Sequence, residues 1–208
     1  MWKIPILILV LLGMLQLSEA QEMIHEFYES GEVKSEGKLA DGLKIGEWRF
    51  FYPDGKLNSI EIYVEGELNG RVVYYFPNGQ VQGIETWRNG SLFDSAFYYH
   101  DNGTLDKKGA YVNSSYSGTW YHYFESGIIE RVVNYSNGLP EGETKVYNKK
   151  GVLIQKGSYH RGQESGEWSF YGDDGTLEYF GSYREGNPIG IWYSFLKGKK
   201  KVYKRYKN

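Results

Sequence analysis

The chain has 208 residues, a formal net charge of −2 and no cysteine. The lack of cysteine excludes disulfides, thiolate metal sites and catalytic thiols. Its 27 glycines, 20 tyrosines and 6 tryptophans are typical of many short strands joined by glycine turns, and they leave little room for helix.

The N-terminal segment resembles a secretory signal. Lys3 precedes an apolar run from Ile4 to Leu17, and the small-residue site Ser18-Glu19-Ala20 follows it. We therefore expect residues 1–20 to be a signal peptide cleaved before Gln21, and the mature protein to be secreted, periplasmic or on the cell surface. An uncleaved anchor is the alternative, but a run of about 14 apolar residues is shorter than the roughly 20 of a spanning helix. No transmembrane span is expected after cleavage.

Residues 21–196 form a repeat domain. An aromatic residue lies four positions before each of seven glycines and an aliphatic residue two positions after, as Phe51 and Leu57 do around Gly55. A partial eighth unit opens at Phe195. This fixed period predicts seven repeat units. The glycines recur every 24 residues at Gly31, Gly55, Gly79, Gly103, Gly127, Gly151 and Gly175.

The turn chemistry predicts that each unit is a β-hairpin. In the segment 52–56 (Tyr-Pro-Asp-Gly-Lys), Pro suits a type I turn and Gly suits a left-handed residue. A three-residue loop with a G1 bulge is the favoured interpretation, and a two-residue type I′ loop is the alternative. In the favoured register Phe51, Leu57 and Tyr63 share one face, and Trp48 points to the other.

One hairpin cannot bury its own apolar face, so the units must stack. The expected fold class is all-β: an elongated single antiparallel sheet of tandem 24-residue hairpins, forming an open solenoid. A compact globule is the alternative.

The unit 157–177, with its spaced Gly162, Gly166 and Gly175 and its aromatic Trp168, resembles the MORN repeat variant family. The resemblance extends over nearly all of the mature chain. It implies a β-hairpin array that mediates protein or membrane-lipid contacts, and an antitoxin-like label that many bacterial variants carry. Asp94 and Ser114 replace glycines that the pattern would place there, which predicts a kink or an altered loop near residues 91–118.

No catalytic motif can be recognised, so we expect no enzyme activity and no cofactor. Asp residues in turns are expected for their own hydrogen bonds rather than for calcium. The histidines His25, His100, His122 and His160 are scattered, and no metal site is predicted.

Function is expected to be binding. The main hypothesis is a secreted scaffold for protein–protein contacts, extending to membrane surfaces; the alternative is a carbohydrate or cell-wall binding module with stacked Trp and Tyr side chains. The partner would be an unknown protein or an anionic surface, and the acidic body disfavours nucleic acid. Packing in the core is the competing role for the periodic aromatics. The candidate binding residues are Trp48, Trp120, Trp168 and Trp192.

The segment 197–208 is a basic terminal strand or tail with seven basic residues and no acidic one. Lysines on an edge strand hinder further strand addition, which is the favoured interpretation. Docking to an anionic surface is the alternative.

Overall fold

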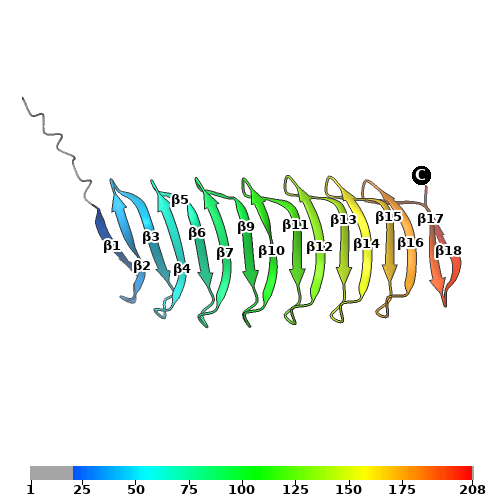
Figure 1. Cartoon of the computed structure of the whole chain (residues 1–208), viewed down its shortest axis with the longest axis horizontal. Helices are drawn as coiled ribbons and strands as arrows, with labels where there is room; N and C mark the ends of the chain where they lie inside the picture. Colours follow the sequence, from blue (N-terminus) through cyan, green and yellow to red (C-terminus); the bar gives the residue numbers. More distant parts are fainter. Residues whose placement is uncertain (1–20, 208) are drawn as a thin grey trace, which may run out of the picture.

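The computed structural model describes residues 21–207, and all 18 of its strands belong to one antiparallel sheet (Figure 1). The described part of the chain contains strands and turns and no helix. Figure 1 shows the hairpins side by side along one long axis, so the predicted elongated sheet of hairpins is confirmed. The predicted signal peptide, residues 1–20, lies outside the described residues.

The strands follow one another along the sheet in sequence order. They are β1 (Glu22–Phe27), β2 (Val33–Ala40), β3 (Leu43–Phe51), β4 (Leu57–Val64), β5 (Glu67–Leu68), β6 (Gly70–Tyr75), β7 (Val81–Arg88), β8 (Ser91–Leu92), β9 (Asp94–Tyr99), β10 (Leu105–Val112), β11 (Ser115–Tyr123), β12 (Ile129–Ser136), β13 (Leu139–Tyr147), β14 (Leu153–His160), β15 (Gln163–Tyr171), β16 (Leu177–Arg184), β17 (Asn187–Leu196) and β18 (Lys199–Arg205).

The loops at one end of the hairpins are three residues long. The Tyr52 N–H donates to the Lys56 carbonyl at 2.7 Å, and the Gly55 N–H donates to the Tyr52 carbonyl at 2.9 Å. Gly55 has φ +78°, which a side chain would strain. This is the type I turn with a G1 bulge that the sequence favours, and the two-residue loop is excluded here. The seven equivalent glycines all have φ between +78° and +92°.

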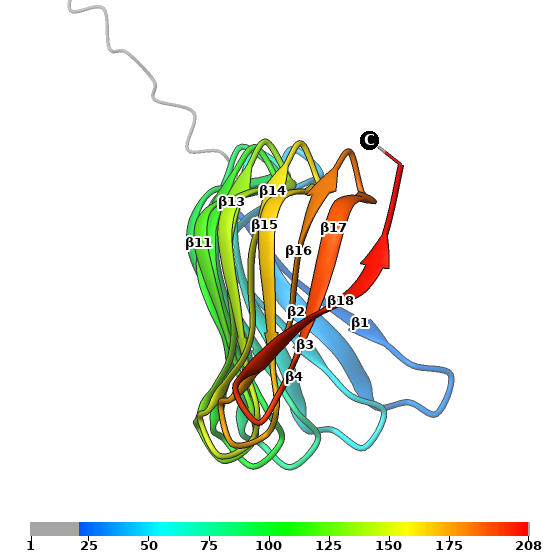
Figure 2. The same cartoon turned by 90° about the vertical axis from the view of Figure 1, so that its right-hand side faces the viewer.

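The opposite ends are joined by two-residue turns. Asp41 and Gly42 have φ of +51° and +78°, and Ala40 pairs with Leu43 around them. Two consecutive positive φ values define the type I′ turn, whose twist matches that of the flanking strands. Because both ends are tight hairpins, the chain forms a continuous meander. Figure 2, along the long axis, shows β1–β4 rotated away from β11–β15 by the accumulated twist.

The loop bulges change which residues share a face. Phe51 pairs with Leu57, as predicted, but Phe50 pairs with Ser59, so Asn58 is left over in β4. That extra residue interrupts the alternation of side chains. Tyr63 therefore lies on the face of Trp48, with their rings 6.4 Å apart, and its predicted place beside Phe51 and Leu57 is wrong.

The core is a row of side chains on this one face, here called the Trp face. The row crosses the sheet with about one residue per strand, and its tryptophans are 0–6% exposed. Pairing between neighbouring strands connects its members. The row contains Trp48, Glu61, Val72, Glu85, Ala96, Gly109, Trp120, Val133, Thr144, Gly157, Trp168, Gly181 and Trp192.

Candidate functional site

The four predicted binding tryptophans are core residues. Trp48 and Trp168 are each 1% exposed, Trp120 is 0% and Trp192 is 6%. Each indole N–H donates to a backbone carbonyl across the hairpin, at 3.0 Å from Trp48 to Lys38 and 3.1 Å, 3.2 Å and 3.3 Å in the other three. The expectation that these indoles lie on an open face is wrong, because each ring packs into the sheet and its polar atom is satisfied there.

Glycine makes that burial possible. A β-carbon at Gly109 would overlap the Trp120 ring, and the same holds for Gly37, Gly157 and Gly181 beneath their own indoles. Each of these glycines lies eleven residues before its tryptophan. The three other units have neither residue at these positions: Glu61 with Val72, Glu85 with Ala96, and Val133 with Thr144. In these seven units, a tryptophan therefore occurs in the row only where the facing residue is glycine.

Carboxylates occupy the row where two successive indoles are missing. Glu85 is 9% exposed and accepts hydrogen bonds from the Tyr98 hydroxyl at 2.7 Å and from the Trp87 indole at 2.9 Å. Burial, together with hydrogen bonds to Tyr111 and Glu85, raises the pKa of Tyr98. Glu61 accepts in the same way from the Tyr63 hydroxyl at 2.6 Å. These satisfied contacts form a polar segment of the core.

Two cationic side chains flank a histidine on the Trp face. Lys107 pairs with His122, and His122 with Arg131. The His122 Nε2 is buried without a hydrogen-bond partner. Burial, with the nearby Arg131 and Lys107 acting in the same direction, lowers the pKa of His122 to about 4. His122 is therefore neutral at ordinary pH.

The opposite face, here called the column face, carries partly exposed apolar side chains. Ile60 pairs with Val73, Val73 with Ile84, and Ile84 with Phe97, which makes a stripe across four strands. Successive residues of a strand point to opposite faces, and Phe50 lies on the Trp face, so Phe51 and its partner Leu57 lie on the column face. The equivalent aromatic and aliphatic positions of the other units lie on the column face as well. None of these side chains is fully buried. They are Phe51, Leu57, Tyr75, Val81, Tyr99, Leu105, Tyr123, Ile129, Tyr147, Leu153, Tyr171 and Leu177.

An aromatic recess of about 290 Å³ lies near the C-terminal end of the sheet. Tyr179, 37% exposed, and Tyr203, 58% exposed, meet there with ring centroids 5.2 Å apart. The recess is lined by Phe170, Tyr179, Tyr183, Pro188, Trp192, Tyr203 and Tyr206. Ring faces on the Trp face reach solvent here, and Trp192 is the one predicted tryptophan among the lining residues.

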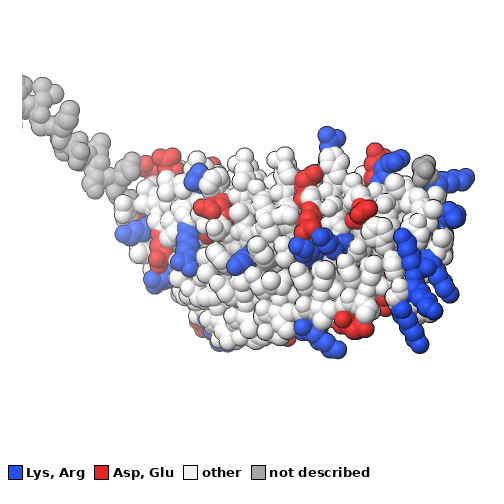
Figure 3. All heavy atoms as spheres, turned by 45° about the vertical axis from the view of Figure 1, so that its right-hand side comes forward, with Lys and Arg blue, Asp and Glu red and all other residues white. Residues whose placement is uncertain are grey.

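The C-terminal edge is basic. Figure 3 shows Lys and Arg side chains gathered at this end of the molecule, at the right of the view. Residues Lys199–Arg205 form β18, which pairs with β17 and joins it through a two-residue turn at Lys197 and Gly198. Every residue of β18 is exposed.

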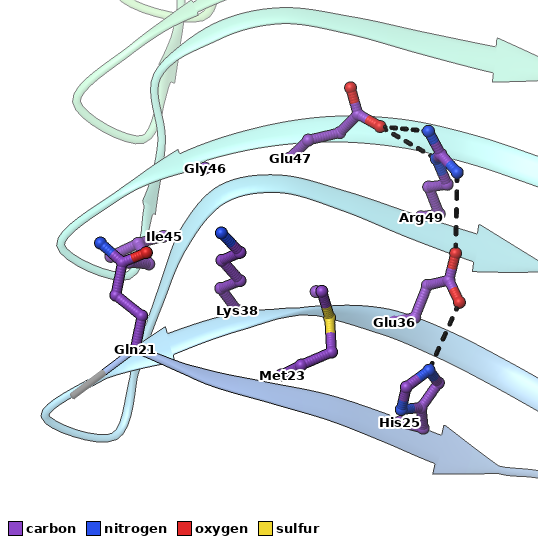
Figure 4. Close-up of a pocket in the computed structure, with 10 residues that line it drawn as sticks. Gln21, Met23, His25, Glu36, Lys38, Ile45, Gly46, Glu47 and Arg49 are labelled. Carbon is purple, nitrogen blue, oxygen red and sulfur yellow. Dashed lines mark hydrogen bonds and ion pairs between the residues drawn. The ribbon is translucent and has the colours of Figure 1, made fainter.

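A hollow of about 790 Å³ lies beside the N-terminal edge, on the column face (Figure 4). A chain of charges borders it: His25 lies 3.6 Å from Glu36, and Arg49 lies 3.8 Å from Glu36 and 2.9 Å from Glu47. These exposed pairs contribute little to stability, about 0–1 kcal/mol each.

Two of the histidines lie beside carboxylates. His100 contacts Asp106 at 3.7 Å and His160 contacts Glu141 at 3.0 Å. Among residues 21–207, no three His, Asp or Glu side chains are grouped to hold a metal ion. The same residues include no helix of the length and apolarity needed to cross a membrane.

Comparison with known families decides what the repeats are. The profile of the MORN repeat variant family matches four units, at residues 44–65, 68–89, 116–137 and 140–161. The chain contains MORN-variant repeats. The matched MORN units lie on both sides of residues 90–115, which include the departures Asp94 and Ser114. Both of those residues nevertheless adopt the positive φ of a glycine, +65° and +59°.

Solved structures that the chain matches include crystal structures of TcdB2-TccC3 and of TcdB2-TccC3-Cdc42, at 13% and 14% sequence identity and TM-scores of 0.22 and 0.23. Each match covers 88% of this chain and 14% of the other, so this chain spans a small part of those proteins. Likeness at this level carries no inference about function. No curated protein matches the MORN-repeat chain.

Proposed function

We propose that this MORN-repeat protein is a non-enzymatic, exported binding scaffold that recognises a protein partner on its column face. The observation that carries the proposal is the unequal use of the two faces. The Trp face buries its central row of tryptophans in the sheet, whereas the stripe Ile60, Val73, Ile84 and Phe97 has no fully buried member.

The composition of the column face suits a protein partner. Aromatic and aliphatic side chains alternate along it in fixed register, as in the pairs Tyr75 with Val81 and Tyr99 with Leu105. Contiguous apolar surface of this kind marks interaction sites in soluble proteins. The rigid sheet presents it with little loss of conformational entropy, and repetition multiplies weak contacts.

Site-specific photo-crosslinking in the producing cell tests this proposal. A photoreactive phenylalanine analogue would replace Phe97 on the column face, Tyr179 in the aromatic recess or Phe124 in a loop. We expect a crosslink to one discrete protein from position 97 and none from position 124. With that partner purified, Ile84→Glu should weaken binding by about tenfold or more, the loss expected when one apolar contact is replaced by a buried charge. Crosslinking from positions 124 and 97 alike would contradict the proposal.

Carbohydrate binding is the second candidate, and the aromatic recess favours it. Sugar rings stack on accessible aromatic faces, and here such faces belong to Tyr179 and Tyr203 rather than to the buried tryptophans. Titration of the protein with purified wall polysaccharide, using Tyr203→Ala beside Tyr121→Ala as the control, separates the two candidates. Binding that depends on Tyr203 alone would favour the carbohydrate function.

A further inference from the structure

The two end strands of the sheet carry opposite charges. Among residues 21–207 the two edges of the sheet are β1, which holds Glu22 and Glu26, and β18, in which every residue is exposed and five are basic. An open edge displays unpaired backbone N–H and C=O groups that can pair with another strand. Apolar residues of these edge strands are also uncovered: Met23 of β1 is 56% exposed and Val202 of β18 is 49% exposed.

The direction of the strands permits the two edges to join. Of the 18 strands, β5 and β8 have two residues each, which leaves sixteen long strands in an antiparallel meander. Because sixteen is even, β18 runs opposite to β1. The β1 strand of a second copy placed beside β18 would therefore continue the same antiparallel alternation, with the Trp faces of both copies on one side.

The register of the repeat brings the charges together. Ile24 lies 24 residues before Trp48, so it takes the place of a tryptophan in the central row, and Lys204 pairs with Trp192 in that row. Continuing the row places Ile24 of the second copy beside Lys204. Glu22 and Glu26, two residues to either side, then become diagonal neighbours of Lys204, within reach of a long side chain.

We propose that this protein assembles head to tail, the basic edge strand β18 of one copy pairing with the acidic edge strand β1 of the next. The contact joins two different surfaces without a closing rotation, so it continues as an open filament that follows the twist of the sheet. The charges also select the pairing: β18 against β18 would oppose lysines, and β1 against β1 would oppose glutamates. The lysines thus hinder the wrong edge contact and favour this one.

Charge reversal at each edge tests the assembly. The samples are the protein and its variants as purified from the producing cells. The N-edge variant is Glu22→Lys with Glu26→Lys, and the C-edge variant is Lys201→Glu with Lys204→Glu. In sedimentation velocity at about 20 mM salt, where screening is weak, the mean sedimentation coefficient of the unsubstituted protein should increase with protein concentration. Each variant alone should associate about tenfold or more weakly, since cross-strand attractions become repulsions.

An equimolar mixture of the two variants is the decisive sample. The N-edge variant places positive charge beside the central row at both edges, and the C-edge variant places negative charge there, although Lys199, Lys200 and Arg205 remain in β18 of the latter. Mixed in equal amounts, the two should therefore assemble again in alternation. Matched controls with equal charge changes away from the edges are Glu65→Lys with Glu185→Lys, and Lys149→Glu with Lys150→Glu; both should associate as the unsubstituted protein does. Melting curves verify that every variant is folded.

The proposal is overturned if the unsubstituted protein stays monomeric at low salt, or if the folded variants do not restore assembly when mixed. Neither result bears on partner recognition by the column face, because the edge strands are separate from the Ile60–Phe97 stripe.

Discussion

The indole of Trp120 covers Gly109, which lies eleven residues earlier on the neighbouring strand of the same hairpin. No side chain fits between the glycine and the ring. We predict that Gly109→Ala destabilises the protein by about 1–3 kcal/mol or more, as overpacking of a rigid core does. Gly172→Ala is the control, because the added carbon there meets the flexible end of Glu178. Thermal unfolding of both variants measures the difference, and equal shifts would contradict the packing argument.

Two neighbouring aromatics should separate stability from recognition. Trp120 is 0% exposed, so Trp120→Ala should cost about 3–5 kcal/mol of folding free energy. Tyr121 points to the column face and is partly exposed, so Tyr121→Ala should cost clearly less while weakening partner binding. Denaturant unfolding beside an affinity measurement on the crosslinked partner compares them. A folded Trp120→Ala protein with selectively lost binding would restore the tryptophans as recognition residues.

Asp94 should be replaceable by glycine with a gain in stability. It has φ +65° at a position where other units have glycines such as Gly118 and Gly142, with φ of +66° and +79°. A left-handed conformation costs a residue with a β-carbon roughly 1 kcal/mol, somewhat less for Asp. Asp94→Gly should therefore raise the melting temperature by a few degrees. The reciprocal Gly118→Asp should lower it, and a fall in both variants would refute the argument.

Stability should fall in mild acid because of His122. Its folded pKa is about 4, below the ordinary 6.5, so the unfolded chain binds the extra proton first. The contribution of neutral His122 to the free energy of unfolding is therefore complete above a pH of about 6.5, and it is lost as the pH falls toward about 4. The cationic Lys107 and Arg131 act in the same direction, and Asp106 opposes them.

The variant that tests this pH dependence is His122→Phe, since Phe50 and Phe170 occupy the equivalent position in other units. Urea unfolding between pH 7 and 4 should show a smaller loss of stability for this variant than for the unsubstituted protein. Identical profiles for His122→Phe and the unsubstituted protein would show that His122 does not titrate as stated.

The sequence by itself determines the hairpin array. A turn glycine such as Gly55 requires its left-handed conformation locally, and the 24-residue period repeats the same local decision in every unit. The three-residue loop and the elongated sheet could therefore be predicted without any long-range contact. The extra residue Asn58 was beyond that reasoning, because it depends on how two strands align.

Only the tertiary structure decided which face is the core. Both faces of this single-layer sheet carry periodic aromatics, so alternation alone cannot distinguish them. Burial depends instead on what lies across the strand: Trp48 lies over Gly37 and is 1% exposed, whereas Phe51 lies opposite Leu57 and stays partly exposed. The joint occurrence of Gly and Trp eleven residues apart was present in the sequence. Its meaning required the paired strands, because a ring can sink into a sheet only where the facing residue has no β-carbon to exclude it.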